Sequence, residues 1–328
     1  MRKSYFLVSV SNKKNLDLCM QYCLAGFMNN ISGVWTFTEI TEGDLISFLF
    51  GAKAHNLYLV KKKEAIRKAE YAPPWQPITF QQSGKTYNFP FRLHLQPIRE
   101  FEELLVRAEF AYVAENLLLR GGYRRTHFQA DQTTLQAASQ MGVLWNKDTS
   151  QLEISDYPVF TPHFTRRKEQ IDIPEVFQFH EFILQSLVRH YLCVEKNLGD
   201  LLNEIGVKDF SPKEFEVLGE KAFPEGHIDI LVKEATPMGV SRKMIIEVKT
   251  GAGTKRDLGQ LRSYAEEIGN ECIAAILIAR SFSPVMVKTA KDKQIKLVTY
   301  AFTGLININT PNKFGDLLTN LQLVINDG

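Results

Sequence analysis

Two apolar runs rich in β-branched residues lie in the C-terminal half of the chain. Residues 228–232 and 244–248 are each bounded by Gly, Pro or Lys, a pattern typical of buried strands. Side chains alternate along a strand, so pairing the two runs would bring Asp229 beside Glu247. Glu247 and Lys249 would then point the same way. The pattern predicts a hairpin that carries two carboxylates and a lysine.

Further apolar runs surround this hairpin and predict a mixed sheet flanked by helices. Before it, residues 175–205 predict one or two helices and residues 215–223 a strand. After it, Gln260 and Tyr264 share one face of a helix, four residues apart. The remaining predictions are a strand over 272–278, a helix over 283–293, a strand over 295–302 and a closing helix over 316–325.

In the first hundred residues the pattern of apolar and polar positions predicts mostly short strands. The predicted elements are strands over 5–10, 45–50, 57–60 and 87–97, an early helix over 15–25, and a strand or turn at 33–35. Further along, a strong amphipathic helix is predicted over 99–119 and a shorter helix over 132–141. We therefore predict an α/β protein of two domains, over residues 1–100 and 174–328. Residues 101–173 would form a helical extension and interdomain connection.

Composition adds few constraints. The 328 residues are 45% hydrophobic and 23% charged, which is ordinary for a globular protein. No apolar run reaches the length of a membrane span, and the first residues lead straight into a strand-like run. The four cysteines form no zinc-binding pattern. We expect a cytoplasmic protein with reduced thiols and no membrane partner.

The formal net charge is only +2, so nucleic-acid binding would have to rest on local basic patches. One patch spans residues 53–68 and includes Lys61 and Lys62. The other contains Arg120, Arg124 and Arg125 beside a Gly-Gly pair. Taken alone, such a patch is more often a solvated face.

The paired carboxylates indicate a metal site. Two buried carboxylates repel each other and lose hydration, and a divalent cation relieves both costs. Hard oxygen ligands favour Mg²⁺, which often uses one or two carboxylates together with water and phosphate. Lys249 would then orient or help to deprotonate an attacking water, or stabilise charge in the transition state.

The order Asp229, Glu247, Lys249 and then Gln260 on the next helix resembles the PD-(D/E)xK nuclease superfamily. The similarity is greatest to a branch that includes mismatch nucleases, and it covers about the last 150 residues. That branch carries one more acid on a preceding helix, which Glu195 matches. The structural alternative is an ion pair at a strand end.

This resemblance implies a restriction-endonuclease-like α/β/α core with a mixed sheet. It implies that Asp229, Glu247 and Glu195 bind Mg²⁺, with Mn²⁺ as a substitute. Lys249 would act on the water or the transition state, and Gln260 would orient Lys249 or the phosphate.

The first hundred residues resemble PUA-like domains of the EVE and YTH-like groups, which are small β-barrels with helices. The matching features are Asn15 near the start of the early helix, residues 43–48, a Pro-Trp pair in a loop, and residues 89–93. The resemblance implies a pocket for a flipped base. Phe27, Trp35 and Trp75 would be its walls, with Ser11 and Asn15 facing the base edge. Either Phe27 or Trp35 would be the first wall, and both are equally compatible with a core position.

Together the two resemblances predict a modification-dependent (type IV) restriction endonuclease that reads a modified base in double-stranded DNA and cuts nearby. One active site per chain suggests a homodimer on DNA. The first alternative is a mismatch- or structure-directed DNA nuclease. The second is a modified nucleic-acid binding protein whose nuclease fold is silent.

Overall fold

The computed structural model describes residues 3–51, 53–102, 126–152, 156–207, 210–223, 226–304 and 306–326. The chain forms two compact units. The N-terminal unit contains Arg2–His163 and Lys168–Phe177, and the C-terminal unit contains Phe164–Arg167 and Gln178–Gly328. No helix in the described ranges is both long and apolar enough to cross a membrane.

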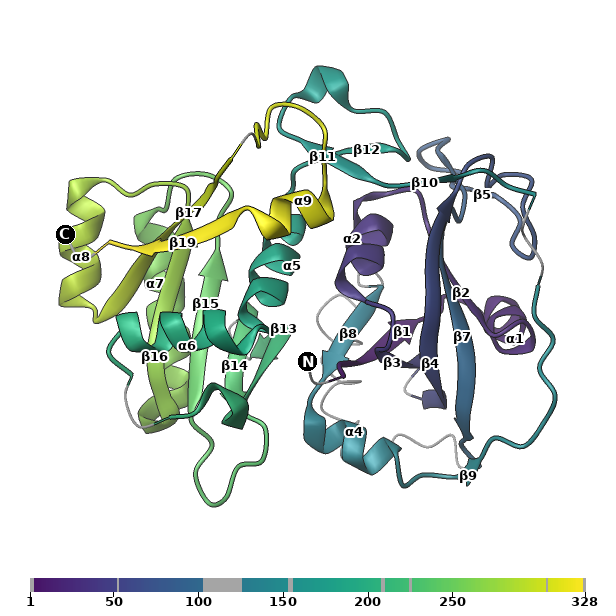
Figure 1. Cartoon of the computed structure of the whole chain (residues 1–328), viewed down its shortest axis with the longest axis horizontal. Helices are drawn as coiled ribbons and strands as arrows, with labels where there is room; N and C mark the ends of the chain where they lie inside the picture. Colours follow the sequence, from purple (N-terminus) through teal and green to yellow (C-terminus); the bar gives the residue numbers. More distant parts are fainter. Residues whose placement is uncertain are drawn as a thin grey trace. The chain divides into compact units, whose positions relative to one another are not determined.

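The N-terminal unit is built on one mixed sheet with the strand order β2-β7-β4-β3-β1-β8 (Figure 1). Only β1 and β3 are parallel along this path. The strands are β1 (Tyr5–Ser9), β2 (Leu24–Phe27), β3 (Leu45–Phe50), β4 (Lys53–Ile66), β7 (Phe91–Glu100) and β8 (His127–Ala130). Shorter strands are β5 (Ile78–Thr79), β6 (Thr86–Tyr87), β9 (Val143–Leu144) and β10 (Val159–Phe160). The described helices are α1 (Lys13–Gln21), α2 (Ile31–Glu39) and α4 (Gln132–Ala138).

Several predictions for this unit need correction. The early helix ends at Gln21, and the chain continues directly into β2. Residues 33–35 are not a strand or turn but part of α2, which begins after Asn30, whose side chain accepts a hydrogen bond from Gly33 N at 2.8 Å. The pairing path ends at β2 and β8, so a closed barrel stays a prediction.

The segment assigned to an interdomain connection also differs. Residues 126–163 belong to the N-terminal unit, because β8 pairs antiparallel with β1 and β10 pairs with β4. The predicted helix over 99–119 falls almost entirely outside the described residues, since residues 103–125 are not described. Arg120, Arg124 and Arg125 lie there too.

The C-terminal unit is built on a six-stranded mixed sheet with the order β13-β14-β15-β16-β17-β19 (Figure 1). Its strands are β13 (Phe215–Phe223), β14 (Gly226–Glu234), β15 (Lys243–Val248), β16 (Cys272–Ala279), β17 (Ile295–Phe302) and β19 (Leu321–Ile325). The helices are α5 (Glu181–Leu192), α6 (Glu195–Glu204), α7 (Lys255–Ile268), α8 (Pro284–Asp292) and α9 (Phe314–Thr319). A further short strand of this unit is β18 (Asn312–Lys313), while β11 (His163–Thr165) and β12 (Val176–Gln178) each begin in the N-terminal unit and end in the C-terminal unit.

The predicted strands of this unit and the helix over 283–293 are confirmed, as is the mixed sheet: β13, β14 and β15 are antiparallel, and β15, β16 and β17 are parallel. Helices α7 and α8 pack on the sheet through a shared apolar cluster. The closing helix is wrong in its second half, where Leu321–Ile325 is a strand that pairs antiparallel with β17.

Candidate active site

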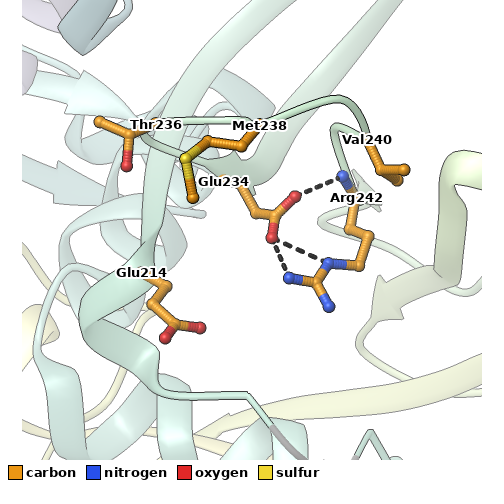
Figure 2. Close-up of a pocket in the computed structure, with 6 residues that line it drawn as sticks. All are labelled: Glu214, Glu234, Thr236, Met238, Val240 and Arg242. Carbon is orange, nitrogen blue, oxygen red and sulfur yellow. Dashed lines mark hydrogen bonds and ion pairs between the residues drawn. The ribbon is translucent and has the colours of Figure 1, made fainter.

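The hairpin of β14 and β15 has polar groups at both ends. At its turn lies a cavity of about 530 Å³ (Figure 2). Its lining residues are Glu214, Glu234, Thr236, Met238, Val240 and Arg242. Glu234 is engaged by Arg242, which donates to it from its backbone N at 2.9 Å and from Nε at 2.8 Å. The acidic groups of this cavity are thus partly neutralised, and the candidate chemistry lies at the other end.

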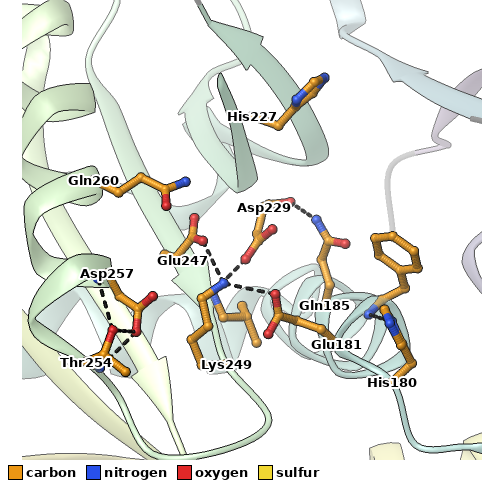
Figure 3. A network of polar contacts seen from close by, with 12 residues as sticks. His180, Glu181, Gln185, His227, Asp229, Glu247, Lys249, Thr254, Asp257 and Gln260 are labelled. Atoms are coloured by element: carbon orange, nitrogen blue, oxygen red, sulfur yellow. Dashed lines mark hydrogen bonds and ion pairs between the residues drawn. The ribbon is translucent and has the colours of Figure 1, made fainter. Parts of the chain in front are cut away.

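At the open end, the strand register brings the two predicted carboxylates together. Ile230 pairs with Ile246, so the next step along the antiparallel hairpin places Asp229 opposite Glu247. This is the juxtaposition that the strand pattern predicts (Figure 3).

Asp229 is held by two neighbouring segments. Its Oδ2 accepts a hydrogen bond from Val248 N at 2.8 Å, and its backbone carbonyl accepts one from Gln185 Nε2 on α5 at 2.5 Å. Burial and then the Glu247 carboxylate raise the pKa of Asp229 well above its usual value. The carboxylate form of Asp229 therefore carries a cost that a cation would relieve.

Glu247 is only 3% exposed and has one satisfied oxygen. Its Oε1 accepts a hydrogen bond from Lys249 Nζ at 2.8 Å. Its Oε2 is buried, and no hydrogen bond reaches it from the described residues. Burial also raises the pKa of Glu247. A buried carboxylate oxygen without a partner is costly, and bound ligands are one way to satisfy it.

Lys249 lies between two carboxylates. Besides Glu247, its Nζ donates to Oε1 of Glu181 at 2.9 Å (Figure 3). Burial acts to lower the pKa of Lys249, but the charges of Asp229 and Glu247 outweigh it and raise the pKa overall. The amine is therefore held as an ammonium in this arrangement.

The acidic residue of a preceding helix that the structure places beside Lys249 is Glu181 and not Glu195. Glu181 is the first residue of α5, where the positive end of the helix dipole favours a carboxylate. Glu195 begins α6, its side chain is 63% exposed, and its ion-pair partner is Lys213 at 4.0 Å. The sequence signal that separates them is the composition of the two helices: seven of the twelve residues of α5 are apolar, against three of the ten of α6.

Gln260 supports the site indirectly. Its Nε2 donates to the hydroxyl of Tyr264 at 2.8 Å, and this hydroxyl donates to the carbonyl of His227 at 3.2 Å. Within the described residues no hydrogen bond joins Gln260 to Lys249, which the resemblance had suggested. Gln260 and Tyr264 instead fix β14 two residues before Asp229.

The donor set fits a hard divalent cation, although it is not a finished cage. No group of three or more His, Cys, Asp or Glu side chains in the described ranges is placed to hold a metal. Mg²⁺ often uses only one or two carboxylates plus water and phosphate, so Asp229 and the open oxygen of Glu247 suffice. The Oε1 atom of Glu181 accepts a hydrogen bond from Lys249, so Glu181 is not counted among the metal ligands.

The predicted base-binding aromatics are buried. Phe27, Trp35 and Trp75 are 4%, 2% and 4% exposed. Trp75 covers Gly26, where a Cβ would come within 2.3 Å of its ring, and the guanidinium of Arg92 lies 5.3 Å from the ring centroid. These rings lie in the core of the N-terminal unit in this structure, as the alternative for Phe27 and Trp35 expects, and their role as walls of a base pocket stays a prediction.

The polar residues assigned to the base edge lie at the start of α1. Ser11 is exposed and Asn15 is half-buried, and the backbone N of Asn15 donates to the side chain of Asn12, which caps the helix, at 2.8 Å. Of the predicted backbone-binding lysines on β4, Lys61 is exposed and Lys62 pairs with Glu64 at 2.6 Å. The basic stretch is thus partly neutralised within its own strand.

Comparisons with known proteins do not assign the chain to a family. No protein-family model and no curated protein matches it. Among solved structures, an EndoMS–dsDNA2 complex matches with a TM-score of 0.23 and 12% identity, over 74% of this chain and 75% of that one. The MspJI restriction endonuclease in complex with a 27-mer oligonucleotide matches with a TM-score of 0.17 and 10% identity, over 81% and 60%. TM-scores this low do not establish a common fold, so the function has to be argued from the site itself.

Proposed function

We propose that this chain is a metal-dependent endonuclease that hydrolyses DNA phosphodiester bonds in its C-terminal unit. The observation that carries the proposal is the group of Asp229, Glu247 and Lys249, in which the buried Oε2 of Glu247 has no partner in the described chain. An ordinary strand-end ion pair would satisfy both oxygens of such a carboxylate. An open oxygen beside a second carboxylate is what a metal ligand needs.

The residues divide the work. Bound Mg²⁺ or Mn²⁺ would supply Lewis acidity toward a phosphate oxygen and lower the pKa of a bound water. Asp229 and Glu247 would hold it. The ammonium of Lys249 would stabilise negative charge on the attacked phosphate, and Glu181 would orient that ammonium. Gln260 would act through Tyr264 by fixing β14.

DNA as the substrate, and a modified base within it, rest on the sequence resemblances. The finer proposal is a modification-dependent restriction endonuclease whose N-terminal unit reads the base. Phe27, Trp35 and Trp75 lend it no support, because a base stacks on an open ring face and these faces are covered.

The same burial favours the second candidate, a mismatch- or structure-directed DNA nuclease. Such an enzyme needs the site of Asp229, Glu247 and Lys249 in the C-terminal unit, but it needs no aromatic cage for a modified base. In this version the N-terminal unit would position the substrate.

The test is cleavage of one plasmid in several modification states, with Mg²⁺ or Mn²⁺. The states are unmodified, N6-methyladenine, 5-methylcytosine, hydroxymethylcytosine and glucosylated DNA, next to duplexes with mismatches or branches. Glu247→Gln removes the negative charge of the proposed metal-binding carboxylate, and Glu195→Gln is the matched control outside the site. Cutting of one modified form alone supports the sensor, and cutting of mismatched or branched duplexes supports the second candidate. Tight DNA binding without cutting in any arm would leave a silent nuclease fold.

A further inference from the structure

A loop follows Lys249 and runs beside the end of the next strand. Strands β15 and β16 are parallel, with Val248 paired to Ile278, so their carboxyl ends meet at one edge of the sheet. Beyond them, Arg280 N donates to Gly251 O at 2.9 Å, and Gly253 N donates to Ser281 O at 3.1 Å. Arg280 therefore lies at the edge that carries Glu247 and Lys249, and its side chain is exposed.

A second arginine reaches the same loop from Phe164–Arg167, the short segment that belongs to the C-terminal unit. Arg166 Nη2 donates to Thr250 O at 3.0 Å and to the hydroxyl of Tyr300, which itself donates to Thr250 O at 2.8 Å. The guanidinium also lies 5.7 Å from the ring centroid of Phe179. Arg166 is thus fixed against the residue that follows Lys249.

Both cations lack a carboxylate partner in the described residues. Other arginines of the chain do have one, as in the ion pairs Arg67–Glu175, Arg242–Glu234 and Arg262–Glu266. No such pair is formed by Arg166 or Arg280 within the described residues. Burial raises the pKa of Tyr300, and the charges of Arg166, Arg280 and Glu181 all act on the same hydroxyl.

Charge balance indicates what these cations could bind. The site holds three carboxylates, those of Asp229, Glu247 and Glu181, and one ammonium, that of Lys249. Its net charge is therefore −2 when all four groups are ionised, and one divalent cation neutralises it. A nucleic-acid backbone brought to this metal adds one negative charge per phosphate. Arginine offers a planar fork that matches phosphate oxygens. Cations left unpaired at the rim of the site would meet that charge.

We propose that Arg166 and Arg280 form a phosphate clamp that holds the DNA backbone beside the scissile bond. Arg166, fixed by Thr250 and Tyr300, would set the position of the strand relative to Lys249. Arg280, on the exposed rim, would bind an adjacent phosphate. The inference rests on the proposed function in one respect, the choice of DNA as the ligand.

The experiment measures binding separately from cleavage. In the Glu247→Gln background the full-length chain is titrated with a fluorescein-labelled unmodified duplex, and anisotropy is recorded across a salt series. Loss of one phosphate contact should lower the slope of log K against log salt by about 1. We expect this for Arg280→Gln and for Arg166→Gln. Arg262→Gln, an exposed arginine paired with Glu266, is the matched control and should bind as its parent does.

Two additions keep the outcome clear. Because Arg166 also packs against Phe179 and Tyr300, Arg166→Lys is included. It keeps the charge, so it should restore the salt slope in the Glu247→Gln background. In the chain that keeps Glu247, the same substitution should still reduce cleavage. Unchanged slopes in the Arg280 and Arg166 variants, or no duplex binding at all, would overturn the clamp. If the slopes fall as expected but the natural chain cuts no DNA, the clamp stands and the proposed nuclease activity fails.

Discussion

The ammonium of Lys249 is shared between Glu181 and Glu247, at 2.9 and 2.8 Å. We expect Glu181→Gln to reduce cleavage by about 10–100-fold, the usual effect of removing a residue that orients a catalytic group. Glu195→Gln should leave cleavage within about twofold of the natural chain, because Glu195 is exposed on α6 and its ion-pair partner is Lys213. Initial rates on a plasmid measure both variants. The reverse order of effects would return the role to Glu195.

The ionised form of Asp229 should destabilise the metal-free protein at neutral pH. Burial and Glu247 raise its pKa, so the folded chain binds a proton at Asp229 more readily than the unfolded chain does. Its contribution to stability is therefore present at low pH and is lost as pH rises through the raised pKa. With a chelator at neutral pH, Asp229→Asn should gain about 1 kcal/mol, or roughly 2–4 °C in Tm.

Thermal melts across pH, with and without Mg²⁺, test this. The advantage of Asp229→Asn should shrink as the pH is lowered, and Mg²⁺ should raise the Tm of the natural chain but not that of the variant. A variant that melts below the natural chain in chelator would contradict the account.

The neighbours that could be predicted from the sequence are those that depend on local strand pairing. Asp229, Glu247 and Lys249 sit on two strands of one hairpin, and the two-residue period of a strand decides which side each faces. Glu181 could not be placed this way, because its approach to Lys249 depends on how α5 packs on the sheet. For Phe27 and Trp35 the sequence could not separate a cage from a core position, since an aromatic residue suits either until its neighbours are known.

The C-terminal end of helix α2 in the N-terminal unit is capped by a lysine from strand β4. Lys63 Nζ on β4 donates to the carbonyl of Phe37 and, at 2.7 Å, to that of Ile40, at the end of α2. Such carbonyls have no partner within the helix. Lys63→Met should cost about 1–3 kcal/mol by leaving them unsatisfied. Its neighbour Lys62 is largely exposed, and Lys62→Met should cost less than about 0.5 kcal/mol.

Denaturant unfolding followed by tryptophan fluorescence measures this selectively. All three tryptophans, Trp35, Trp75 and Trp145, belong to the N-terminal unit. Equal midpoints for the two lysine variants would show that Lys63 contributes nothing to the end of α2.

Elements were predictable where a hydrophobic period was visible. The strands of the C-terminal unit are apolar runs of ordinary strand length, and the structure keeps them. Helix α2 was missed because seven of its nine residues are buried and because its β-branched and aromatic residues and its glycine suit a strand or a turn as well as a helix. The strand β19 was taken for helix because its pairing with β17 is a long-range contact that the local pattern does not reveal.

At the scale of the whole molecule, a single cut point does not separate the two units. Phe164–Arg167 belongs to the C-terminal unit, Lys168–Phe177 to the N-terminal unit, and Gln178 onward again to the C-terminal unit. A boundary at residue 173, as the sequence suggests, would separate Phe164–Arg167 from the C-terminal unit to which it belongs. The hydrogen bonds of that segment within the C-terminal unit include Arg166 N to Ile308 O at 2.8 Å, Phe179 N to Thr165 O at 2.7 Å, and Arg166 Nη2 to Thr250 O at 3.0 Å.

A fragment of residues 162–328 should therefore be more stable than one of residues 174–328. At about 0.5–1.5 kcal/mol for each hydrogen bond, the difference should be about 2–4 kcal/mol, or roughly 10 °C in Tm. Neither fragment contains a tryptophan, so circular dichroism is the measurement. An Arg166→Gln version of the longer fragment should lose part of the difference, because it keeps the backbone bonds of residues 165 and 166 but not the bonds from the guanidinium. Equal melting of the two natural fragments would mean that residues 164–167 do not stabilise the C-terminal unit, and the fixed position of Arg166 beside Lys249 would lose its support.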